Sequence, residues 1–157
     1  MKKFTTYIIL ISLLLIVLGG CQLSNKPNQD IFQYMGSYIG NNSAVGNIIT
    51  QLPQSKAFKQ VTLQTKKKPY GMVIEYGDGT GNIKNSVINN ATYLIALVKN
   101  VEWISFDFPN EKYTLTRQEI QQWYGKDLSD IKNEKDLKNL IQTNLKDKNK
   151  VNDLLKK

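Results

Sequence analysis

The chain has 157 residues and a formal net charge of +8, with 41% hydrophobic and 22% charged residues. This length fits one ordinary domain and a targeting segment, and the composition favours a packed fold over a disordered chain. There is no histidine and only one cysteine. Ser-His-Asp and Cys-His catalytic sites, imidazole proton transfer, Cys/His zinc sites and intramolecular disulfides are therefore excluded.

The first twenty residues have the three regions of a secretory signal peptide. Lys2 and Lys3 form a short basic region, residues 7–18 are an apolar stretch of twelve, and Gly19 and Gly20 are small. Twelve helical residues span roughly 18 Å, well short of the roughly 30 Å hydrocarbon core of a bilayer. We therefore expect residues 1–20 to be a cleaved leader, and its removal leaves a charge of +6.

The motif Leu18-Gly19-Gly20-Cys21 resembles the lipobox of bacterial lipoproteins. The resemblance implies cleavage between Gly20 and Cys21 and a diacylglycerol on the Cys21 sulfur, which would hold the protein on the outer face of the cytoplasmic membrane. Two acyl chains give the stable attachment that one chain does not. The alternative is an incidental cysteine after an uncleaved apolar helix. In the lipoprotein interpretation, residues 21–29 are the lipidated cysteine and a polar tether.

The remaining residues, 30–157, are predicted to form a single domain that begins with two helices. Apolar residues at helical spacing predict a first helix from Asp30 to Tyr38. A second begins at Asn42 or Ser43 as the capping residue and is stopped by Pro53. Gly46 costs this helix about 1 kcal/mol relative to alanine, which suggests a role in close packing.

Two hairpins and a central helix follow. Alternating residues predict strands over 58–65 and 71–76 and over 101–108 and 112–115. The strongest helical pattern lies between the hairpins, from Asn82 to Lys99. The glycine-rich run that precedes it has neither nucleotide-binding spacing nor a calcium-loop frame and is expected to be a turn.

The last third of the domain is predicted to be helical. Thr116 and Glu119 have the spacing of a capping box, and the helix that they begin ends at Gly125. One or two amphipathic helices follow and are expected to cover an edge or face of the sheet. The predicted fold is α+β, with a four-stranded antiparallel sheet from two hairpins, packed on a central helix between flanking N- and C-terminal helices.

Two kinds of candidate site emerge. Trp103 lies on the strand face opposite the apolar one, and with the turn lysines it forms a candidate binding surface for an envelope protein, an anionic polymer or lipid. Nucleic acid is not an expected partner behind a signal peptide. A pair of carboxylates could instead hydrolyse a wall polymer. The lysines are Lys66, Lys67 and Lys68, and the carboxylates are Glu75, Asp78, Glu102, Asp107 and Glu111. No metal or cofactor is predicted.

The body of the chain resembles a domain of unknown function found in lipoproteins of Gram-positive bacteria. Residues 38–49, 64–71 and 115–125 carry the likeness, which extends over about 30–145. Some members of that family accompany sensor-type membrane proteins of antibiotic-response systems, which implies a regulatory role, and the family supplies no catalytic residues. A non-enzymatic binding or regulatory module of the cell envelope is therefore expected, with a hydrolase as the alternative.

Overall fold

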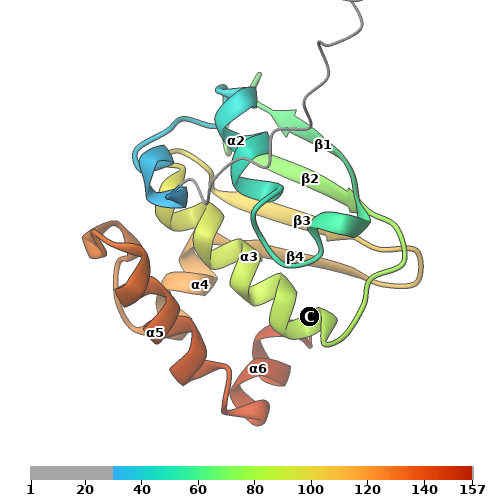
Figure 1. Ribbon diagram of the computed structural model, residues 1–157, viewed down its shortest axis with the longest axis vertical. Helices are drawn as coiled ribbons and strands as arrows, with labels where there is room; N and C mark the ends of the chain where they lie inside the picture. The colour runs from blue at the N-terminus through green and yellow to red at the C-terminus, as the bar shows by residue number, and fades with distance from the viewer. Residues whose placement is uncertain (1–29, 157) are drawn as a thin grey trace, which may run out of the picture.

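A four-stranded sheet and a long helix organise the computed structural model, which describes residues 30–156 (Figure 1). The predicted leader, Cys21 and tether lie outside the described residues. The strands, in spatial order, are β1 (Phe58–Gln64), β2 (Gly71–Tyr76), β3 (Trp103–Asp107) and β4 (Lys112–Thr116). The helices are α2 (Asn42–Ile49), α3 (Ile83–Leu97), α4 (Arg117–Tyr124), α5 (Glu134–Asn144) and α6 (Lys148–Leu155), and the 3-10 turns are η1 (Ile31–Tyr34), η2 (Ser55–Ala57) and η3 (Leu128–Asp130).

The predicted α+β class and four strands are confirmed, but the all-antiparallel sheet is wrong. Each hairpin is antiparallel, whereas β2 and β3 pair in parallel, with Gly71 opposite Trp103 and Glu75 opposite Asp107. The reason is α3. Its 15 residues span about 22 Å, close to the roughly 20 Å of the six-residue β2, so the helix returns the chain to the end at which β2 began.

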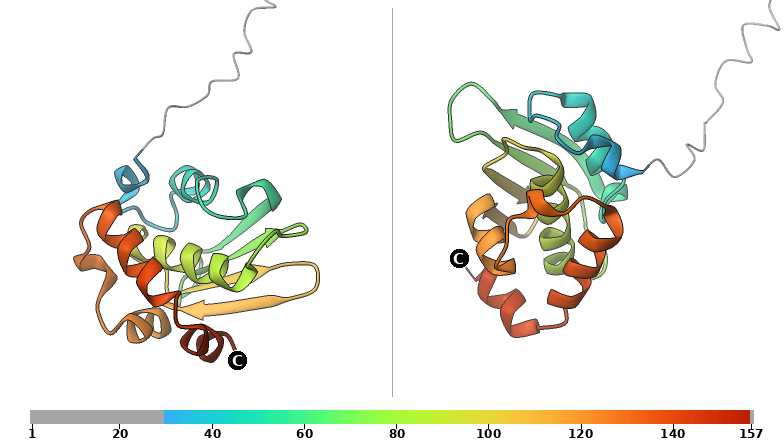
Figure 2. Two further views of the ribbon diagram at one scale, coloured as in Figure 1. Left: turned by 60° about the horizontal axis from the view of Figure 1, so that its bottom comes forward. Right: turned by 90° about the vertical axis from the view of Figure 1, so that its left-hand side faces the viewer.

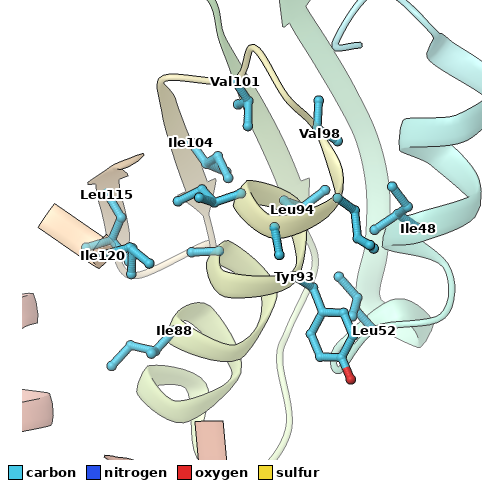
Figure 3. Packing of buried hydrophobic residues seen from close by; sticks show 14 of the residues in the cluster. Ile48, Leu52, Ile88, Tyr93, Leu94, Val98, Val101, Ile104, Leu115 and Ile120 are labelled. Carbon is cyan, nitrogen blue, oxygen red and sulfur yellow. The ribbon is translucent and has the colours of Figure 1, made fainter. Parts of the chain in front are cut away.

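Helix α3 is buried along most of its length, as 11 of its 15 residues are buried. On one side it packs against the sheet and α2, and Figure 3 shows Leu94 between Ile104 of β3 and Ile48 of α2. On the other side it contacts α5, α6 and η3. From Ala91 to Leu97, Thr92 is the one residue of α3 without an apolar or aromatic side chain. A helix segment of this kind must be covered on all sides, so α3 joins the two layers around one core.

The C-terminal helices are therefore a third layer. They were expected to cover an edge or face of the sheet, but their main contacts are with α3, and Figure 2 shows α3 between the sheet and α5. Their apolar stripes supply Leu137, Ile141 and Val151 to the core. Within residues 30–156, no helix combines the length and apolar character needed to cross a membrane.

The predicted first helix is much shorter in the structure. Asp30 caps it as expected, but η1 ends at Tyr34 and the chain turns at Gly36, which has a φ of 83°. The Gly36 N–H then donates to the carbonyl of Leu97 at 3.0 Å, and Ser37 bridges to Val98. The first helix therefore does not continue past Tyr34, because residues 36 and 37 pair with the end of α3 instead.

The other predicted caps agree with the structure except at α2. Asn82 accepts from the backbone of Asn85 at the start of α3, and both bonds of the Thr116–Glu119 capping box are present. For α2, the cap is Asn41, whose side chain accepts from Ala44, one residue earlier than predicted. Local hydrogen bonding fixes these boundaries.

Gly46 does not serve the predicted close packing. It lies inside α2, and a methyl group added there would meet no atom within 4 Å other than its chain neighbours and the backbone of its own helix. The glycine therefore weakens α2 without a compensating contact.

Replacing Gly46 with alanine should raise the free energy of unfolding by about 0.5–1 kcal/mol, because alanine loses less backbone entropy in a helix. Urea denaturation of the two proteins measures the difference. A destabilised Gly46→Ala variant would mean that this position is tightly packed.

Candidate functional site

Three connecting loops are joined by hydrogen bonds at one end of the molecule. The loop after η1 binds the connection from α3 to β3 through Lys99 N–H to Ser37 O at 2.9 Å. The loop between β1 and β2 binds the same connection through Glu102 N–H to Tyr70 O at 2.8 Å. The right-hand view of Figure 2 faces this end. These contacts make the three loops one continuous surface.

Arg117 fixes the connection between α3 and β3. Its Nε donates to Val101 O at 2.9 Å and its Nη2 to Val98 O at 2.7 Å, next to the end of α3. Burial lowers the pKa of Arg117, although the negative charges of Glu102 and Asp127 oppose this shift. The guanidinium thus satisfies the carbonyl of Val98, the residue that caps α3, and the carbonyl of Val101 within the connection, so it ties the two ends of this loop together.

Trp103 is packed onto the sheet rather than projecting from it. Its ring covers Gly71, the parallel neighbour, so closely that a Cβ on Gly71 would lie 2.0 Å from a ring carbon. The indole Nε1 donates to Pro69 O at 3.1 Å. Trp103 is partly buried, and it is therefore an anchored platform beside the lysine loop, not the freely exposed residue that its strand position allowed.

Tyr38 is the strongly exposed aromatic of this end. It is 58% exposed, the only large hydrophobic residue so exposed among residues 30–156. The Lys99 Nζ lies 5.8 Å from the Tyr38 ring centroid, and the Lys68 Nζ lies 5.9 Å from that of Tyr70. Each pair places an ammonium group over an aromatic face.

The charge of this end is strongly positive. Residues 31–74 contain no Asp or Glu, and Lys66, Lys67 and Lys68 are three of their five lysines; the other two, Lys56 and Lys59, lie near the start of β1 at the opposite end of the sheet. Lys66–Lys68 and Lys99 are all exposed, and Glu102 is the acidic residue within the three loops. We call this surface the aromatic–lysine end, which consists of Tyr38, Lys66, Lys67, Lys68, Tyr70, Lys99 and Trp103.

The predicted carboxylates do not converge on one site. Glu75 and Asp107 are direct neighbours on β2 and β3, on the polar face of the sheet. Asp78 and Glu111 line a hollow of about 140 Å³ at the opposite end from Glu102. Within the described part of the chain, no group of three or more His, Cys, Asp or Glu side chains could hold a metal ion.

The carboxylates of Glu75 and Asp107 are bound to neighbouring side chains. Glu75 accepts from Gln60 Nε2 at 2.8 Å, and Asp107 accepts from Ser105 Oγ at 2.7 Å and Lys112 Nζ at 2.9 Å. Partial burial raises the pKa of Asp107, but the hydrogen bonds from Ser105 and Lys112 and the lysine charge outweigh it, so the pKa lies below its ordinary value. Asp107 is thus held ionised and is unsuited to act as a general acid.

A second concave feature lies between η1, the end of α2, α3 and α5. This hollow has a volume of about 640 Å³, within the range of small-molecule sites. At its wall the Tyr93 hydroxyl donates to Glu134 Oε1 at 3.2 Å, and Lys138 pairs with the same oxygen at 2.9 Å. Burial, followed by the Glu134 charge and hydrogen bond, raises the pKa of Tyr93. These polar groups satisfy one another.

The sequence from residue 31 to residue 120 matches the profile of a family described as a domain of unknown function, DUF4825. The chain belongs to the DUF4825 family. No curated protein and no solved structure matches it. The DUF4825 match ends within α4 rather than near residue 145, where the likeness was expected to end. It contains the whole aromatic–lysine end, whereas the wall that α5 gives to the 640 Å³ hollow lies beyond it.

The structure brings together all four predicted surface residues of the DUF4825 chain, but for an unpredicted reason. In an antiparallel arrangement of β2 and β3, Trp103 would begin its strand at the far end from Lys66–Lys68. The parallel pairing places them side by side. Tyr38, Tyr70 and Lys99 were missed as members of this surface. The acid-free stretch 31–74 was a usable signal for the two tyrosines, whereas Lys99 lies outside it and joins the surface through the parallel pairing.

Gly71→Ala should lower the free energy of unfolding by about 1–3 kcal/mol, because the new methyl group displaces the Trp103 ring. Urea denaturation measures the loss, and a changed indole emission would report the ring movement. Gly40→Ala is the matched control, since a Cβ there meets nothing within 4 Å. Equal effects of the two changes would contradict the packing of Trp103 on Gly71.

Proposed function

We propose that the protein is a lipoprotein held on the outer face of a bacterial cytoplasmic membrane by diacylglycerol on Cys21. There it is a non-enzymatic binding or regulatory module, and its aromatic–lysine end contacts an anionic component of the cell envelope. The proposal joins a sequence argument for the anchor with a structural argument for the surface.

The argument for the anchor is the order of the leader residues. A basic start, twelve apolar residues and two glycines precede Cys21, which is the arrangement of a processed leader. This is the only cysteine in the sequence, so a role for it in an intramolecular disulfide is ruled out. Lipidation gives this single thiol a function.

The main support for a binding role is that three loops are joined by hydrogen bonds at one end of the molecule. Their hydrogen bonds present four exposed lysines and three aromatic rings on a rigid surface. Lysines supply long-range attraction to an anion, and aromatic rings supply contact area with a polar edge. A surface of this composition fits a binding module better than a site of chemistry.

The hydrolase alternative receives less support. Two-carboxylate hydrolysis requires a protonated carboxyl beside an ionised one. Asp107 is held ionised by Ser105 and Lys112, and its neighbour Glu75 lies on an open sheet face. The other two carboxylates that lie together, Asp78 and Glu111, line a hollow of only about 140 Å³, below the range of small-molecule sites.

Cys21→Ser should release the protein from the membrane fraction of the expressing bacterium, because the sulfur that accepts the lipid is absent. Mass spectrometry of the wild-type N-terminal peptide should find residue 21 as the first residue, carrying a diacylglycerol. Ser24→Ala, three residues away, is the control and should stay with the membrane. A mature wild-type protein with an unmodified Cys21 thiol would refute the anchor.

A further inference from the structure

We propose that the aromatic–lysine end lies directly on the anionic lipid headgroups of the membrane that holds Cys21. This inference deepens the proposed function by naming the partner of the surface, and it rests on that function for the anchor. The partner is the phosphate-bearing bilayer surface itself rather than a protein or a wall polymer.

Charge is the first argument. Lys66, Lys67 and Lys68 are consecutive and exposed, and Lys99 joins them from the neighbouring loop. Each lysine near an anionic membrane surface raises the affinity of the protein for that surface by about fivefold. The attraction extends over about one Debye length. Because Glu102 is the acidic residue of these loops and faces the Arg117 charge, little opposes this attraction.

The aromatic residues are the second argument. Tyr38 is exposed to an extent that no other large hydrophobic side chain of the described residues reaches. Tyrosine and tryptophan rings settle at the headgroup level, where the ring meets apolar material and its polar edge stays hydrated. The ammonium groups over Tyr38 and Tyr70 would lie at the same depth, beside the lipid phosphates.

The position of the anchor is the third argument. The nine residue steps from Cys21 to Asp30 can reach at most about 32 Å, so an anchored domain stays near the bilayer. The described chain starts at Asp30 and, within η1 and the next few residues, arrives at the bridge between Ser37 and Val98. The described chain therefore begins at the end of the molecule that carries the three loops, with η1 on the opposite side of that end from the β1–β2 loop in the right-hand view of Figure 2.

The shape of the surface favours a bilayer over an inserted ligand. The seven residues come from loops and the starts of strands, and none of them lines the 640 Å³ hollow, which opens between η1, α3 and α5. Basic residues and aromatic rings that lie outside this hollow are suited to contact with the phosphates of a membrane surface rather than to enclosing a small ligand.

The test uses residues 22–157 without leader or lipid, since every described core residue lies between Ile31 and Leu155. Vesicle co-sedimentation compares phosphatidylglycerol-containing vesicles with pure phosphatidylcholine. We expect binding to the anionic vesicles only, weakening as salt increases. Thermal unfolding of each variant confirms that it is folded.

Two charge variants separate a local surface from net charge. Lys66→Gln with Lys67→Gln should weaken vesicle affinity by about thirtyfold, at about fivefold per lysine. The matched control is Lys146→Gln with Lys148→Gln, two exposed lysines at the turn between α5 and α6, far from the loops. It should change the affinity by less than threefold. Tyr38→Ala, which removes no charge, should also weaken binding.

The outcomes are distinct. Equal losses of vesicle affinity for the two lysine pairs would overturn the lipid contact. So would the absence of binding to anionic vesicles, including the case in which a purified protein or wall polymer binds the same surface and vesicles do not. Because the tested chain carries no lipid, a negative result leaves the Cys21 anchor standing. An unmodified Cys21 in cells would instead remove the anchor and leave the vesicle result to be judged alone.

Discussion

Burial of α3 from all sides is the constraint on which the rest of this structure depends. The helix presents apolar residues to the sheet and also to α5 and α6, so neither layer is dispensable for shielding it from water. Its length matches that of β2, and it returns the chain to the start of that strand. The parallel pairing of β2 with β3, which distinguishes this sheet from two stacked hairpins, follows from that return.

The candidate surface is a consequence of the same constraint. Since β2 and β3 start at one end, the loop before β2 and the connection after α3 are neighbours, and the loop after η1 is bonded to that connection. Residues distant in sequence thus form the aromatic–lysine end. Its loops are held by backbone hydrogen bonds, by Arg117, which donates to the carbonyl at the end of α3, and by the packing of Trp103 on Gly71. The lysine side chains are not part of these contacts and are exposed to an anionic partner.

Features set by local chemistry could be predicted from the sequence, and features set by distant partners could not. Asn82 and the Thr116–Glu119 capping box correctly predicted the starts of their helices, because the hydrogen bonds of a cap form within one helical turn. The Lys66–Lys68 turn and the apolar face of β3 followed from composition and period. The extent of η1 depended on a bond from Gly36 to Leu97, and the exposure of Tyr38 depended on that turn. The sheet was mispredicted because the two hairpins were treated as separate units, although the predicted strand-helix-strand order from β2 through α3 to β3 is the usual connection between parallel strands.

The most direct test of the central claim is hydrogen exchange on the lipidated, full mature protein in phosphatidylglycerol-containing bilayers, compared with the unlipidated chain in solution. The account predicts slower amide exchange in residues 36–41, 65–70 and 98–102 on the membrane, with the turn between α5 and α6 unchanged. Unchanged exchange in those three loops, or slowing confined to the turn between α5 and α6, would contradict it.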